Sequence, residues 1–97
     1  MLVILERFDL RIHDTRSLKQ KRHVVKTLTA AMTKAFNVSV AEVDHQDLWQ
    51  RAALGVALVG AEEYHLRRVM HEVEKLVDRW AGVAVIDRAI SLHAVED

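Results

Sequence analysis

Apolar residues along this chain follow two different periods, and the order of those periods leaves few possible topologies. Residues 2–12 alternate between apolar and charged side chains, which is the pattern of a strand with one buried face. Glu6 interrupts the apolar side, and the pattern offers no reason for it. The apolar side otherwise consists of Leu2, Ile4, Phe8, Leu10 and Ile12.

Two segments have the spacing of amphipathic helices. Ser17 followed by Gln20 has the spacing of a capping box, so a helix is predicted to begin there and to end near Phe36. Residues 62–80 carry apolar side chains every three or four positions, which predicts a second helix. Residues 38–43, 51–60 and 82–95 are predicted to be the remaining strands.

The resulting order is strand, helix, strand, strand, helix, strand. With right-handed crossovers, this order predicts an α+β fold, the ferredoxin-like βαββαβ sandwich, with two helices on one face of a four-stranded antiparallel sheet. The chain has no proline, only three glycines and no repeat or low-complexity tract. Residues 1–97 are therefore predicted to form a single domain.

Helices on one face leave the other face of the sheet uncovered. We expect Val3 and Leu5 on that open face, with small residues from the third strand such as Ala53, Gly55 and Ala57. An exposed apolar sheet surface in a small chain usually marks a partner, so the sequence predicts a homodimer formed through this face.

Several classes of function are disfavoured by composition. The absence of cysteine excludes disulfides, iron–sulfur clusters and cysteine nucleophiles. The six histidines form no HExxH motif, and no P-loop or Gly-x-Ser-x-Gly sequence occurs, so we expect no metal, no cofactor and no catalytic residues. Asp44, His45 and Asp47 resemble a metal-binding cluster, but polar hairpin loops have the same composition. The amino-terminal apolar stretch is too short for a signal peptide or membrane span, so we expect a cytoplasmic protein without membrane contact.

A net charge of zero conceals two oppositely charged halves. Residues 1–39 carry eight basic and three acidic residues, whereas residues 40–97 carry six basic and eleven acidic ones. Several bases fall in the first turns of the first helix, where the helix dipole disfavours positive charge. The predicted topology brings these turns, residues 17–22, to the same rim as the hairpin loop of residues 44–51 and the turn of residues 80–83.

Helical geometry sorts the bases by direction. Lys21 falls on the apolar arc, while Lys19, Arg22 and Lys26 fall together on the solvent side. Lys21 is predicted to pair with Glu42, Asp44 or Asp47, with anion capture beneath the helix N-terminus as the alternative. The outward bases are either an ordinary solvated face or a surface that follows phosphates, and Arg16, Lys34 and Arg11 add to the local positive charge.

Trp49 lies beside the predicted hairpin loop and has three possible roles. A tryptophan at this position can cover the rim of the core, contact a second copy of the chain, or stack on a nucleic-acid base. The sheet of an RNA-recognition motif displays aromatic residues, but residues 51–60 contain none. Any RNA contact is therefore expected to be electrostatic and weak in sequence preference.

The segments "SLKQKRHVVKTL" and "FNVSVAEVDHQDLWQRAALGVALV" resemble the YlxP-like family of small uncharacterised bacterial proteins, over essentially the whole chain. The SLKEKR-type run of that family is matched here by Ser17, Leu18, Lys19, Lys21 and Arg22, with Gln20 in place of the usual acid. This replacement makes the rim more positive. The second motif is matched by Ala41, Glu42, Asp44, Asp47, Trp49, Gln50 and Arg51.

The resemblance implies a ferredoxin-like fold and genomic company with translation initiation and ribosome-assembly factors; no established activity comes with it. We therefore expect a non-enzymatic domain that contacts ribosomal RNA or a ribosomal particle. The alternative is a homodimeric module that binds a small anionic ligand or a protein partner at the rim. The candidate nucleic-acid or anion-binding residues are Arg16, Lys19, Lys21, Arg22 and Lys26, and the candidate rim-loop residues are Glu42, Asp44, His45, Asp47, Trp49, Gln50 and Arg51.

Overall fold

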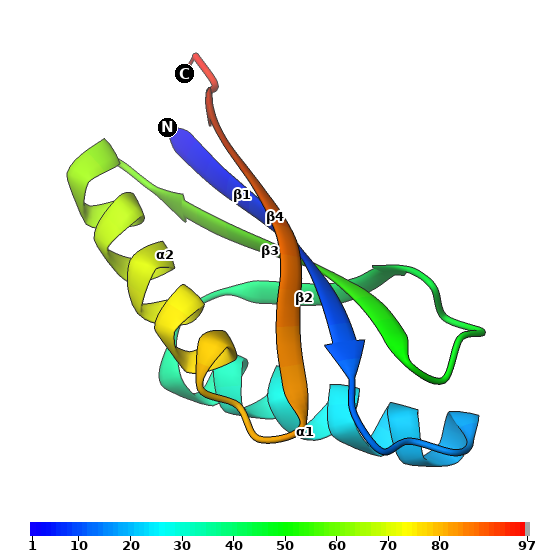
Figure 1. Cartoon of the computed structure of the whole chain (residues 1–97). Helices are drawn as coiled ribbons and strands as arrows, with labels where there is room; N and C mark the ends of the chain where they lie inside the picture. Colours follow the sequence, from blue (N-terminus) through cyan, green and yellow to red (C-terminus); the bar gives the residue numbers. More distant parts are fainter. Residues whose placement is uncertain (97) are drawn as a thin grey trace.

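Six elements follow one another in the order predicted from the periodicity. A computed structural model of the chain describes residues 1–96 and shows a twisted sheet with two helices beneath it (Figure 1). The predicted boundaries agree with the observed ones to within one or two residues. The elements are β1 (Leu2–Ile12), α1 (Leu18–Ala35), β2 (Ser39–Asp44), β3 (Arg51–Gly60), α2 (Glu63–Asp78) and β4 (Val83–Ala94).

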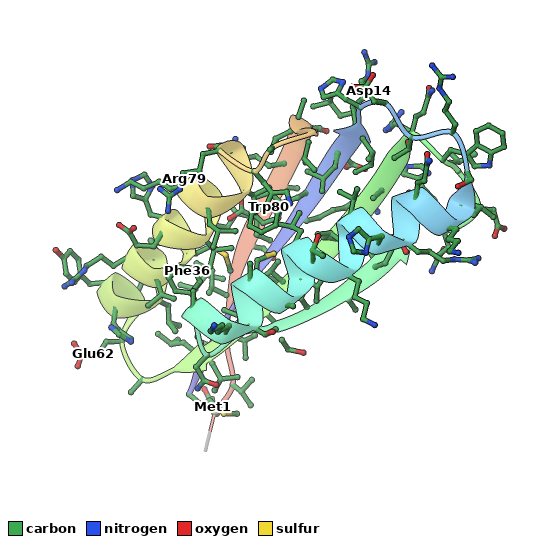
Figure 2. All side chains as sticks on the ribbon, turned by 90° about the horizontal axis from the view of Figure 1, so that it is seen from below. Met1, Asp14, Phe36, Glu62, Arg79 and Trp80 are labelled. Carbon is green, nitrogen blue, oxygen red and sulfur yellow. The ribbon has the colours of Figure 1, made fainter. Side chains whose placement is uncertain are left out.

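The strands form one sheet in the order β2-β3-β1-β4, and every neighbouring pair is antiparallel. Each helix connects two strands that are not neighbours, so both crossovers pass over the same face of the sheet. Figure 2 views the molecule from that side, with both helices in front of the strands. The chain therefore has the predicted ferredoxin-like α+β fold.

The core lies between the sheet and the helices. The predicted alternation of β1 is confirmed, because Ile4, Phe8, Leu10 and Ile12 are all buried on the helix side. The apolar stripes of the helices supply the opposite wall, and their fully buried members are Leu28 and Met32 from α1 and Leu66, Met70, Val73 and Val77 from α2. Glu6 shares the side of β1 that faces this core and is only 2% exposed.

Two register shifts interrupt the sheet. One lies between Asp9 and Leu10 where β1 pairs with β4, and the other lies between Glu42 and Asp44 where β2 pairs with β3. Along β2, Ser39, Ala41 and Val43 alternate onto the face away from the helices, and the side chain of Val43 lies against Gly55. Glu42 faces the helices, and the second shift then brings Asp44 opposite Ala53 on the uncovered face. The strand interpretation of residues 38–43 did not anticipate this shift.

The open face carries the predicted small residues. Leu5, Gly55 and Ala57 line a shallow hollow on it, and Val3 pairs with Val59 at its border. Ala53 is fully buried, because charged side chains near that end of the sheet cover it.

The two ends of the described chain lie side by side, away from the loop that joins β2 and β3 (Figure 1). The backbone N–H of Val95 donates to the carbonyl oxygen of Met1 at 2.8 Å. Neither helix within residues 1–96 is long and apolar enough to cross a membrane.

Gly60 provides a test of the packing between β3 and α2. A Cβ atom at Gly60 would lie 2.7 Å from Cδ2 of the fully buried Leu66. We expect Gly60→Ala to lower the free energy of unfolding by about 1 to 2 kcal/mol in urea titration, because Leu66 must leave its packed position. In a Leu66→Ala background the same substitution should cost about nothing. Equal costs in both backgrounds would contradict this contact.

Candidate functional site

The start of α1 is fixed by its N-cap. The Ser17 Oγ atom accepts a hydrogen bond from the backbone N–H of Gln20 at 3.1 Å, as the capping-box pattern predicts. The Gln20 Oε1 atom in turn accepts from the backbone N–H of Arg16 at 2.7 Å, one residue earlier than in the usual reciprocal pair. Since both ends of this turn are bonded, the first bases of α1 have a defined direction.

Three connecting segments meet at one rim of the sandwich, as the topology predicts. The Thr15 hydroxyl donates to the carbonyl oxygen of Trp49 at 2.6 Å, and the backbone N–H of Ile12 donates to that of Gln50 at 2.9 Å. The backbone N–H of His13 donates to the carbonyl oxygen of Gly82 at 2.8 Å. The rim therefore joins the start of α1, the β2–β3 loop and the turn after α2.

Lys21 is fully buried and binds the β2–β3 loop to α1. Its ammonium group donates to the Glu42 Oε2 atom at 2.5 Å and to the carbonyl oxygens of His45 and Gln46 at 2.9 and 3.3 Å. Of the three predicted acidic partners, Glu42 is the observed one. An ammonium group has three donors, and all three are in use. Anion capture by Lys21 does not fit this geometry.

The other bases of α1 are exposed to solvent. Lys19, Arg22 and Lys26 lie within about 60° of one another around the helix axis, and none of them pairs with an acidic side chain in residues 1–96. No acidic residue occurs anywhere between positions 15 and 41. Arg16, just before the cap, is also exposed. We call Arg16, Lys19, Arg22 and Lys26 the basic face.

Helix α2 has a different arrangement of charge. Arg67 pairs with Glu63 at 2.7 Å, and Lys75 pairs with Glu72 at 3.2 Å. These pairs along the helix neutralise part of its own positive charge. The uncompensated field of the basic face is therefore a property of α1 and not of the helical layer as a whole.

The predicted rim-loop residues do not form one group. Asp44 and His45 belong to an ionic network on the open face of the sheet, where the Arg7 guanidinium group pairs with Asp9 at 3.1 Å and with Asp44 at 3.4 Å. His45 lies 3.7 Å from Asp9. The backbone N–H of His45 donates to Asp44 at 2.8 Å and lowers the pKa of that carboxyl group.

The remaining loop residues stay near the rim. Asp47, Trp49 and Gln50 are exposed, and residues 47–51 line a hollow of about 440 Å³. Trp49 is 50% exposed, so it is not a closed lid over the core. The Arg51 side chain is partly buried, and its Nε atom has no hydrogen-bond partner among residues 1–96. In the same part of the chain, no group of three or more His, Cys, Asp or Glu residues is arranged to hold a metal ion.

A buried acidic cluster on the other side of the core was not predicted from the sequence. Glu6 lies beneath α2, and no donor in residues 1–96 reaches either of its carboxyl oxygens. The pKa of Glu6 is raised from 4.5 to about 8. Burial is the largest cause of this increase, and a hydrogen bond with Glu74 is the next. At neutral pH Glu6 is therefore mostly protonated and can donate this hydrogen bond to Glu74.

Arg88 covers the acidic cluster at the edge of the sheet. Its guanidinium group lies 2.8 Å from Asp78, 3.9 Å from Glu74 and 6.0 Å from the centre of the Phe8 ring. Glu74 belongs to the same cluster, and its side chain is only 22% exposed. The position of Glu6 on the buried side of β1 was the available signal for this cluster.

Replacing Lys21 tests its role as an internal bridge. We expect Lys21→Met to lower the free energy of unfolding by about 3 to 5 kcal/mol, because Glu42 and two carbonyl groups lose their donor. Lys19→Met, on the exposed side of the same turn, should change stability by less than about 0.5 kcal/mol. Urea titration of both variants measures the contrast, and similar losses in the two would rule out the bridge.

The pKa of Glu6 predicts how stability varies with pH. Between pH 4.5 and about 8, the folded state holds a proton that the unfolded state releases. Stability should therefore fall as pH rises through this range and level off above it. Glu6→Gln should remove this decline, whereas Glu72→Gln on the exposed side of α2 should keep it. Thermal unfolding at several pH values provides the measurement, and a decline that persists in Glu6→Gln would exclude Glu6 as its source.

The fold and the rim define a small ferredoxin-like α+β domain with a basic first helix. The chain belongs to the family described as "Protein of unknown function (DUF503)", whose model matches residues 3–90. This result confirms the resemblance to YlxP-like proteins. A relative from Bacillus subtilis (strain 168), "Uncharacterized protein YlxP", is 36% identical over 72 residues, which are 74% of this chain and 78% of the relative.

One solved structure supports the fold, and it supports nothing beyond the fold. The de novo designed protein Foldit4 matches with a TM-score of 0.58 and 9% identity, over 99% of this chain and all of the designed one. A point mutant of SnoaB, a cofactor-independent oxygenase from Streptomyces nogalater, matches at a TM-score of 0.48 and 9% identity, over 99% of this chain and 93% of that chain. Such a distant likeness carries no argument about activity.

Proposed function

We propose that this protein is a non-enzymatic binding domain that contacts ribosomal RNA, free or in a ribosomal particle, through the basic face of α1. The observation that carries the proposal is the exposed, unpaired positive charge on one side of a helix without acidic residues. Phosphate groups of RNA are attracted to such a surface because binding releases their counterions. Lys21 contributes by fixing the direction of the helix and makes no contact with RNA.

The geometry suits a backbone contact. Lys19 and Lys26 are seven residues apart, which is about 10 Å along a helix, and Arg22 lies between them. Because these side chains are long and exposed, they can follow successive phosphates without reading bases. Trp49, held beside Thr15 by the backbone bond described above, lies at the same rim and is available to stack on an unpaired base.

The choice of ribosomal RNA rests on the genomic company that the family resemblance implies. Charge alone attracts any RNA, so affinity for ribosomal subunits must be compared with affinity for unrelated RNA of similar length. Sedimentation of the protein with subunits and with each free RNA makes this comparison at low and near-physiological salt.

Neutralising the basic face should weaken binding and its dependence on salt. The triple variant Lys19→Gln, Arg22→Gln, Lys26→Gln should lower the slope of log affinity against log salt by roughly 2 to 3, since up to three phosphate contacts are lost. It should also leave the protein in the supernatant at near-physiological salt. Glutamine is a good helix former, so α1 should remain intact.

A matched control uses α2. The variant Arg68→Gln, Lys75→Gln, Arg79→Gln removes the same charge from two exposed positions of α2 and from its C-cap, Arg79, which points away from α1 (Figure 2). It should bind like the wild type. Equal losses of RNA affinity in both triple variants would mean that binding depends only on net charge, and this result would overturn the proposal. So would a wild-type protein that stays in the supernatant at low salt.

A further inference from the structure

The open face of the sheet is apolar, and its surface is uneven. A hollow of about 500 Å³ lies on it, with a floor of small residues that includes Ala41, Gly55 and Ala57. Leu5 and Val43 line the same hollow and are 40% and 50% exposed. The same face therefore carries both a depression and projecting apolar side chains.

The depression depends on a glycine. A Cβ atom at Gly55 would lie 3.0 Å from Cγ1 of Val43, so the side chain of Val43 can rest on the sheet only because Gly55 has none. Val43 lies on this face by the ordinary alternation of β2, which also places Ser39 and Ala41 there. The shape of the face is thus set by the backbone and does not rely on a mobile loop.

An ionic network lies beside the apolar area of the open face. Arg7 pairs with both Asp9 and Asp44, so the guanidinium charge is compensated and the network has more acidic than basic groups. Arg7 is already paired and is not available to a phosphate group. Strand β3 has no aromatic residue on which a nucleic-acid base could stack. The chemistry that fits this surface is apolar, with few charges to desolvate.

We propose that the open face binds the same face of a second copy of this chain about a twofold axis. A twofold contact requires one surface to supply both projections and the depression that receives them, which is the relief described above. The strands hold 39 residues at about 3.3 Å each and lie about 4.8 Å apart, which gives roughly 600 Å² per copy. Two copies would bury about 1,200 Å², the lower end of the range for specific interfaces, so the dimer is reversible.

This arrangement leaves the helices on the outside of the dimer. Both basic faces stay exposed and point away from the contact, so one dimer presents two equivalent cationic surfaces. The inference does not depend on what those surfaces bind.

Analytical ultracentrifugation over protein concentrations up to about 1 mM tests the contact. The wild type should show a reversible monomer–dimer equilibrium. Leu5→Lys should weaken dimerisation roughly a hundredfold, because it removes an apolar projection and introduces a charge. Tyr64→Lys, which places the same charge at a 76% exposed position of α2, should dimerise like the wild type.

A second variant protects the test from a folding defect. Val59→Lys alters a 58% exposed residue of β3 on the same face, and it should also weaken dimerisation. Circular dichroism identifies which variants are folded. A wild type that remains monomeric at the highest concentration would overturn the proposal. So would a dimer that folded Leu5→Lys and Val59→Lys retain, or one that Tyr64→Lys disrupts.

Discussion

The buried ammonium group of Lys21 is the contact on which the arrangement of the rim depends. A fully buried charge is tolerated only where its donors are satisfied, and here the acceptors come from the β2–β3 loop. The contact holds the loop against α1 and also sets the rotation of the helix. At 100° per residue, a helix with Lys21 facing inward has Lys19, Arg22 and Lys26 facing outward.

Lys21 and Glu6, the buried ionisable side chains within residues 1–96, have opposite surroundings. The Lys21 ammonium group donates to a carboxylate and two carbonyl groups, whereas Glu6 meets mainly other acids and is mostly protonated at neutral pH. One group joins elements at the rim, and the other lies between the centre of β1 and α2. Arg88 shields the acidic cluster around Glu6 from solvent. Neither Lys21 nor Glu6 therefore contributes to the charge that the surface displays.

Patterns local in sequence predicted most of the fold. Alternation located β1, the Ser17 cap located the start of α1, and helical spacing separated Lys21 from its outward neighbours. Features that depend on packing between distant segments could not be predicted in this way. Glu6 has no explanation until α2 brings Glu74 over it.

The divided rim loop could not be predicted for a related reason. A sequence does not reveal a register shift, so Glu42, Asp44 and Trp49 were expected to share one surface. Alternation places Glu42 on the helix side, and the shift brings Asp44 to the ionic network of the open face. The role of the exposed bases is a separate question, because the position of a surface charge does not reveal which ligand it binds.

The first turn of α1 is locally frustrated. Its dipole favours negative charge, yet the turn contains no acid and carries Lys19 beside the cap. A carboxylate at this position would make the isolated protein more stable, so the sequence loses some folding stability in the turn that carries the exposed bases. Such a conflict between local preference and overall fold is expected where selection acts on an interaction rather than on stability. A polyanion would relieve the conflict, and the helix start would be better ordered in a complex than in the free protein.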